Sequence, residues 1–191
     1  MRKIKICEVV IMIRVLIVIS LLVSSALTMA GQKSPLFQVD LIVFIHQQSA
    51  TEQSESKAYS PSHSIALQTA VSPGKPYHLL PASSSNLRNE YWALHRKPQY
   101  QVLLHYSWLQ PANNHRPIEL PLVNRDGWNV AGSLQIIQSN YYLLDTNLRF
   151  SAPNDRQAPF VFAQKQRLKS GIVYYLDHPQ AGMLIKVHKI S

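Results

Sequence analysis

The residues best suited to chemistry lie near the end of the chain, in RLKSGIVYYLDHPQAGMLIKVHKI at 167–190. Asp177 and His178 are adjacent there, and Arg167 and Lys169 stand just upstream. A neighbouring carboxylate and imidazole can perform acid–base catalysis when a nucleophile, a metal or a second carboxylate is close. The same pair is equally suited to a turn.

The rest of the chain supplies no such partner. It has no GxSxG or HExxH motif, and glycine occurs only six times, so no glycine-rich phosphate loop can be formed. The eight histidines show no metal-ligand spacing, and the acidic residues are spread singly. We therefore predict no catalytic residue, no metal and no cofactor. An enzyme would need a site assembled from dispersed residues.

The turn interpretation fits the flanking pattern better. Two apolar runs, 171–176 and 183–190, predict a hairpin with 177–182 as its loop. Asp177 can accept backbone N–H bonds at the first position of the turn, and Pro179 presets φ. Gly182 is expected to supply a permissive φ where the chain re-enters the sheet. His178 has no separate role in this interpretation.

Hydrophobic periodicity predicts one helix and about eight strands. Leu87, Tyr91 and Leu94 form one face of a helix over 84–96, with a serine cluster as candidate N-cap. Trp92 falls off that face, which leaves packing at a sheet edge and an exposed contact both open. The strands are expected at 38–47, 100–109, 118–123, 130–138, 141–150, 160–169, 171–176 and 183–190. Short connections favour antiparallel pairing, so we predict an α+β, mainly β fold: a curved antiparallel sheet or open barrel with one covering helix.

The N-terminal segment predicts export. Basic residues precede the apolar run 15–23, and small residues follow up to Ala30, as in a cleaved signal peptide over 1–30. A start at Met12 and a retained anchor are the alternatives. Cys7, the single cysteine, lies before the apolar run, so the chain is not expected to be a lipoprotein. Residues 31–191 are predicted to form one periplasmic domain with a flexible Ser/Gln/Pro-rich insertion at 48–85, with no stable membrane span after cleavage.

Charge suggests the kind of partner. Four of the 19 basic and one of the 10 acidic residues lie in 1–30, so the remaining chain has a net charge of +6. A dispersed basic surface is suited to a cell-wall polymer, lipid headgroups or an acidic protein, and export argues against nucleic acid. If a glycan surface exists, the best candidates by strand position and chemistry are Arg149, Arg167, Lys169, Tyr174 and Trp108.

Four blocks carry a family resemblance. They are QVDLIVF at 38–44, YQVLLHYSWLQP at 100–111, YYLLDTNLRF at 141–150 and QRLKSGIVYYLDHPQAGMLI at 166–185. In this order they resemble the CsiV family of periplasmic proteins, over most of the chain outside the insertion. The last block is the most specific of the four.

The resemblance implies a non-enzymatic peptidoglycan-binding protein that supports wall synthesis and cell shape. The implied partners are peptidoglycan and, through an outer-membrane activator, a penicillin-binding protein. It supplies no ligand-binding residues. Two alternatives stay open: an adaptor of the synthesis machinery that does not touch glycan, and a hydrolase of wall fragments.

Overall fold

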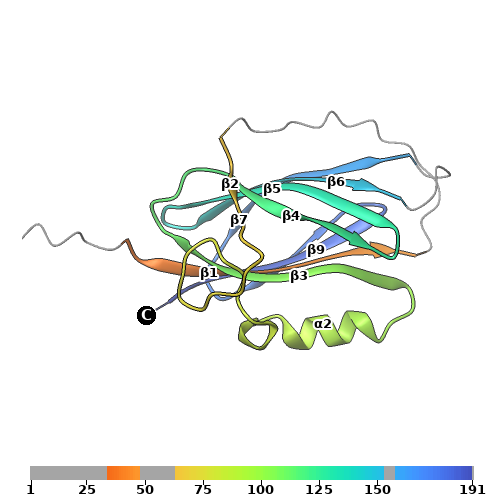
Figure 1. Ribbon diagram of the computed structural model, residues 1–191, viewed down its shortest axis with the longest axis horizontal. Coiled ribbons are helices and arrows are strands. Elements are labelled where there is room, and N and C mark those ends of the chain that lie inside the picture. Colours follow the sequence, from red (N-terminus) through yellow and green to blue (C-terminus); the bar gives the residue numbers. More distant parts are fainter. Residues whose placement is uncertain (1–33, 48–62, 153–157, 191) are drawn as a thin grey trace, which may run out of the picture. The chain divides into compact units, whose positions relative to one another are not determined.

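The protein is described by a computed structural model that covers residues 34–47, 63–152 and 158–190. The predicted signal peptide at 1–30 lies outside these residues. The four-stranded sheet has the order β3-β1-β9-β8, with strands Leu36–His46 (β1), Tyr100–Pro111 (β3), Val173–Asp177 (β8) and Ala181–Lys189 (β9). The five-stranded sheet has the order β2-β4-β5-β6-β7, with strands Ile65–Ala66 (β2), Ile118–Arg125 (β4), Trp128–Gln138 (β5), Tyr142–Ser151 (β6) and Phe160–Leu168 (β7) (Figure 1).

The prediction of a mainly β domain with one helix is confirmed, and neither sheet closes into a barrel. The strands are divided between two open sheets that share one apolar core. Alternation shows which side of a strand is apolar but cannot show which sheet the strand joins. Among the described pairs, only β2 and β4 run parallel. Within the same residues, no helix is long and apolar enough to cross a membrane.

Strand β1 lies between β3 and β9 and is buried on both faces, as its sequence predicts. Its odd-numbered side chains from Phe37 to Ile45 enter the core between the sheets. Ile42 and Phe44 face the other side, where they pack against Leu87 of the helical segment. A strand covered on both faces needs apolar residues at nearly every position, which explains its continuous apolar run.

A β-bulge divides β3 into two halves. The register with β1 steps from Val43–Leu104 to Phe44–Val102, so Leu103 is an extra residue on β3. Before the bulge, the even-numbered side chain of Val102 faces the helix. After it, the even-numbered side chains of Leu104 and Trp108 face the main core instead. The prediction of one continuous face along this strand is therefore wrong, because a bulge shifts the two-residue period by one.

The helix α2 spans Arg88–His95, after the short 3₁₀ turn η1 at Ala82–Ser84. It lies on the side of the four-stranded sheet that faces away from the five-stranded sheet (Figure 1). The predicted apolar face is confirmed, since Leu87, Tyr91 and Leu94 belong to the second core cluster. The predicted serine cap is wrong: Leu87 occupies the N-cap position, and no side chain caps it.

Residues 63–85, the second part of the predicted insertion, are hydrogen-bonded to both sheets. The N–H groups of Tyr77 and Leu80 donate to the carbonyls of Leu109 and Ser107. Through these bonds the segment covers the outer edge of β3 near the end of the strand. This part of the insertion is structured, in contrast to the expectation of a mobile loop. Its contacts are made mostly by backbone groups, which leave no periodic signal in the sequence. Residues 48–62 lie outside the described part.

Candidate functional site

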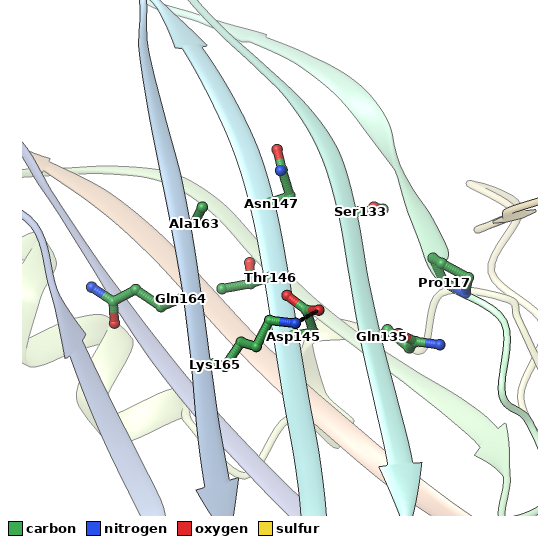
Figure 2. Close-up of a pocket in the computed structure, with 9 residues that line it drawn as sticks. All are labelled: Pro117, Ser133, Gln135, Asp145, Thr146, Asn147, Ala163, Gln164 and Lys165. Carbon is green, nitrogen blue, oxygen red and sulfur yellow. Dashed lines mark ion pairs between the residues drawn. The ribbon is translucent and has the colours of Figure 1, made fainter. Parts of the chain in front are cut away.

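The outward face of the five-stranded sheet carries a band of polar side chains across three strands (Figure 2). Strand alternation turns the apolar residues of β5, β6 and β7 into the core and leaves their neighbours outside. The register places Asp145 between Gln135 and Lys165, and Asn147 beside Ser133. We call Ser133, Gln135, Asp145, Asn147 and Lys165 the polar sheet face.

Small side chains make the centre of this face concave. Ser133 and Ala163 flank Asn147 on the neighbouring strands, and the hollow over them has a volume of about 350 Å³. Figure 2 shows Lys165 reaching across to Asp145, and their Nζ and Oδ2 atoms are 2.9 Å apart. The side chains are 81% and 44% exposed, so this ion pair adds little stability. Amide, hydroxyl, carboxylate and ammonium groups together can donate to and accept from a polyhydroxylated ligand.

Two of the predicted cations lie on this same outward face, at opposite ends. Arg167 of β7 pairs with Leu143 of β6, whereas Arg149 lies six residues further along β6. At about 3.4 Å per residue the two positions are about 20 Å apart. The Arg167 guanidinium lies 4.7 Å from the centre of the Tyr141 ring, which holds it at the surface. The cations therefore frame the polar sheet face rather than form one cluster.

Lys169 and Tyr174 lie close to Arg167 but belong to the corner between the sheets. The Lys169 backbone N–H donates to the Tyr174 hydroxyl over 3.0 Å, while the Tyr174 ring packs against the main core. Tyr174 is thus half-buried and offers only part of its ring. The structure brings together Arg167, Lys169 and Tyr174, and leaves Arg149 at the far end.

The prediction that Trp108 lies on a ligand-contact surface is wrong. Its side chain is fully buried in the core between the sheets. The bulge in β3 is the reason, since it sets the phase that turns Trp108 inward. No ligand can reach the indole without opening the fold.

The Asp177–His178 corner, between β8 and β9 of the four-stranded sheet, contacts β7 of the five-stranded sheet. Residues His178 and Ala181 exchange two backbone hydrogen bonds, so the loop is only Pro179–Gln180, shorter than predicted. The His178 ring stacks on Phe160 of β7 at 4.9 Å, and its Nδ1 accepts the Gln180 N–H at 3.2 Å. Burial lowers the pKa of His178, with the neighbouring Asp177 carboxylate acting in the opposite direction. These contacts support the structural interpretation of the motif.

The two flanking residues act differently from their predicted roles. Asp177 accepts the Tyr175 hydroxyl instead of turn N–H groups. Gly182 does not adopt a positive φ. It belongs to β9 and pairs with Asp177 of β8. A Cβ at this position would meet the Phe44 ring at 2.3 Å, so the glycine makes room for an aromatic side chain. Sequence identifies the corner correctly but not the contacts that require its residues.

A buried polar cluster beneath the helical segment is not apparent from the sequence. Asp40 of β1 is fully buried and accepts hydrogen bonds from Gln38 Nε2 at 2.8 Å, Ser107 Oγ at 2.6 Å and Asn86 Nδ2 at 3.1 Å. His188 Nδ1 lies 3.8 Å away. An acid inside an otherwise apolar central strand was the only available signal. These donors tie the residues before α2 to the sheet.

A serine and a histidine meet beside this cluster. His105 Nε2 lies 2.7 Å from Ser85 Oγ, and the ring stacks on Tyr91 at 4.9 Å. Burial lowers the pKa of His105, while the Asp40 carboxylate raises it. Ser85 is 6% exposed and also accepts the Leu87 N–H, so this pair holds the start of the helix. Among the described residues no three His, Cys, Asp or Glu side chains converge as a metal site.

The described residues form an open β domain with an exposed polar sheet face, an architecture that does not by itself define a function. The family model of CsiV, described as a peptidoglycan-binding protein, matches residues 15–190, and the chain belongs to this family. The family is defined by binding and not by an enzymatic activity. No curated protein and no solved structure matches the chain.

Proposed function

We propose that this protein binds peptidoglycan without catalysis, in the periplasm, through the polar sheet face and the cations around it. The family match over residues 15–190 is the observation that carries the proposal. The polar sheet face is the best surface for this ligand because its side chains present both donors and acceptors around an open hollow.

The chemistry of the polymer matches that surface. Glycan chains present hydroxyl and acetamido groups, which need both kinds of hydrogen-bonding partner, and the attached peptides carry carboxylates. The Asn147 amide and the Gln135 amide oxygen supply the first kind of contact, since Gln135 Nε2 already donates to the His115 carbonyl and Ser133 is buried. Arg149 and Arg167 supply positive charge on either side, which attracts an anionic polymer at low ionic strength.

The wider role follows from the family resemblance. We propose that binding supports wall synthesis and cell shape, through an outer-membrane activator of a penicillin-binding protein. The predicted signal peptide at 1–30 would deliver the chain to the compartment where the polymer lies.

Sedimentation with isolated sacculi tests the proposal. The purified protein should pellet with sacculi at low salt, and the double variant Arg167→Gln/Lys169→Gln should bind about fivefold more weakly, since each exposed charge contributes about 0.5 kcal/mol. A matched control, Lys75→Gln/Lys97→Gln, removes the same charge from exposed positions away from this corner and should bind like the wild type. Wild-type protein that stays in the supernatant would exclude direct wall binding.

The same assay separates the alternatives. Crosslinking to a synthesis protein in cells, combined with no binding to sacculi, would favour an adaptor. Release of soluble muropeptides from sacculi by the purified protein would instead favour a hydrolase.

A further inference from the structure

A second hollow, of about 640 Å³, lies where α2, β3 and β4 meet. Its walls are Arg88, Tyr91 and Trp92 from α2, residues 103–106 of β3 and residues 122–125 of β4, and η1 closes one end. We call it the helix groove. It lies beside the four-stranded sheet and shares no lining residue with the polar sheet face. Its volume is that of a site for a ligand of several hundred daltons.

Two large apolar side chains are exposed at this groove. Trp92 is 52% and Leu122 71% exposed, whereas Tyr91 and Leu94 of α2 are half-buried and two apolar residues of β4 are buried. The indole is held edge-on against Tyr91, with ring centres 5.2 Å apart, and Tyr91 is stacked on His105. Trp92 is therefore fixed at the surface rather than packed at a sheet edge.

The groove is positively charged. Arg88 and Arg125 line it, no carboxylate does, and neither arginine lies within 4.0 Å of an acidic group in the described part of the chain. The nearest acids in sequence are Glu90, two residues after Arg88, and Asp126, which follows Arg125, and neither lines the groove. Asp126 accepts a hydrogen bond from Gln101 Nε2 at 2.8 Å. Arg125 Nη1 donates to the Val102 carbonyl at 3.3 Å, which holds the guanidinium near the groove. Both guanidinium groups remain able to bind a carboxylate in a bidentate manner.

The floor of the groove includes a strand edge. β3 is the edge strand of its sheet, and residues 76–80 cover that edge only around Trp108 and Leu109. Along 103–106 β3 pairs with β1 on its inner edge, and no described strand pairs with its outer edge. Open edges offer alternating backbone N–H and C=O groups to an extended peptide. Four residues of strand give about 13 Å of such edge, enough for a peptide of three or four residues.

We infer that the helix groove binds the peptide part of peptidoglycan, a short extended peptide that carries carboxylates. The strand edge matches its amide groups, the arginines match its carboxylates, and Trp92 and Leu122 match its methyl groups. A bare sugar chain would use none of the strand edge and needs no paired arginines. The inference rests on the proposed function and adds a second, peptide-specific site to the polar sheet face.

Two soluble probes test it: a purified disaccharide-tetrapeptide muropeptide, and the same disaccharide without its peptide. Titration followed by NMR should show the muropeptide shifting the Trp92 indole and Arg88 signals, while the disaccharide leaves them unchanged. Arg88→Gln/Arg125→Gln should weaken muropeptide binding at least tenfold, and Lys75→Gln/Lys189→Gln should not. Trp92→Ala, at an exposed helix position, should also weaken binding and keeps the test valid if loss of the Arg125 contact disturbs the fold.

The outcomes separate this inference from the proposed function. Protein that binds whole sacculi but binds peptide-stripped glycan equally well would overturn the inference alone. Equal affinity for both soluble probes, or unchanged affinity in the folded variants, would overturn it too. If the Trp92 signal responds to an acidic protein segment but not to muropeptide, the groove is a protein-docking site and the inference is wrong. Failure of the wild type to bind any form of sacculus would remove the proposed function itself.

Discussion

Replacing Asp40 by alanine should loosen the attachment of the helical segment to the four-stranded sheet. The carboxylate accepts hydrogen bonds from residues that lie far apart in sequence, among them Asn86 just before α2 and Ser107 on β3. Alanine removes all of these acceptor positions at once. The packing of β1 should survive, because its apolar neighbours are unchanged.

The size of the effect can be worked out from burial. Ser107 is 3% exposed, so its hydroxyl would lose a buried partner, at a cost of about 1–3 kcal/mol. Gln38 would keep its second bond, from Nε2 to the Ser84 carbonyl, and would lose about 1 kcal/mol. Asn86 is exposed and can turn to water. Removal of a buried charge offsets part of this loss, so we expect a net destabilisation of about 1–3 kcal/mol.

Urea unfolding measures this directly. With a dependence of about 2 kcal/mol per molar urea, the midpoint should fall by about 0.5–1.5 M. Glu119→Ala, which removes an exposed acid from β4, is the matched control and should shift the midpoint far less. Amide hydrogen exchange should accelerate in α2 before it does in β5 and β6. A loss below about 1 kcal/mol, or unchanged protection in α2, would refute the assigned role of Asp40.

Three other changes test contacts described above. Gly182→Ala should cost about 1–3 kcal/mol in urea unfolding because its Cβ would meet the Phe44 ring, and a Phe44→Leu background should remove most of that cost; additive losses would argue against the contact. Stability should decrease from pH 7.5 toward pH 5.5, because burial lowers the pKa of His178 and the unfolded chain therefore binds the proton first. His178→Asn should flatten part of this pH dependence of the urea midpoint, and an unchanged slope would contradict the burial argument. Trp108→Phe should lower the thermal midpoint yet leave binding to sacculi unchanged, since the indole is buried; lost binding in a folded variant would mean that the indole serves the ligand.

Local sequence patterns were sufficient for much of the fold. The continuous apolar run of β1 predicts a central strand, and the spacing of Leu87, Tyr91 and Leu94 predicts the face of α2 that packs on the sheet. Both features depend on neighbours within one element, where periodicity is informative.

The errors arose where one element depends on another. The bulge in β3 is produced by its pairing with β1, and it reverses the orientation of Trp108. The partners of Asp40 lie on other elements, so no spacing rule could reveal them. Position 182 must be glycine because the ring of Phe44, which is distant in sequence, occupies the space of a Cβ. The helix groove is formed between α2, β3 and β4, so it could not be predicted without knowing how these three elements pack together.

The position of β1 also has a consequence for how the chain acquires its structure. β1 is the first strand to be synthesised, yet it pairs with β9, the last, along Phe37–Ile45 and Ala181–Lys189. Pairings of such large sequence separation are slow to form, and until β9 is available one edge of the most apolar strand has no permanent partner. The four-stranded sheet therefore cannot be completed until β9, the last of the described strands, is available. Until then the free edge of β1 is open to pairing with other chains, which makes the incomplete chain prone to aggregation.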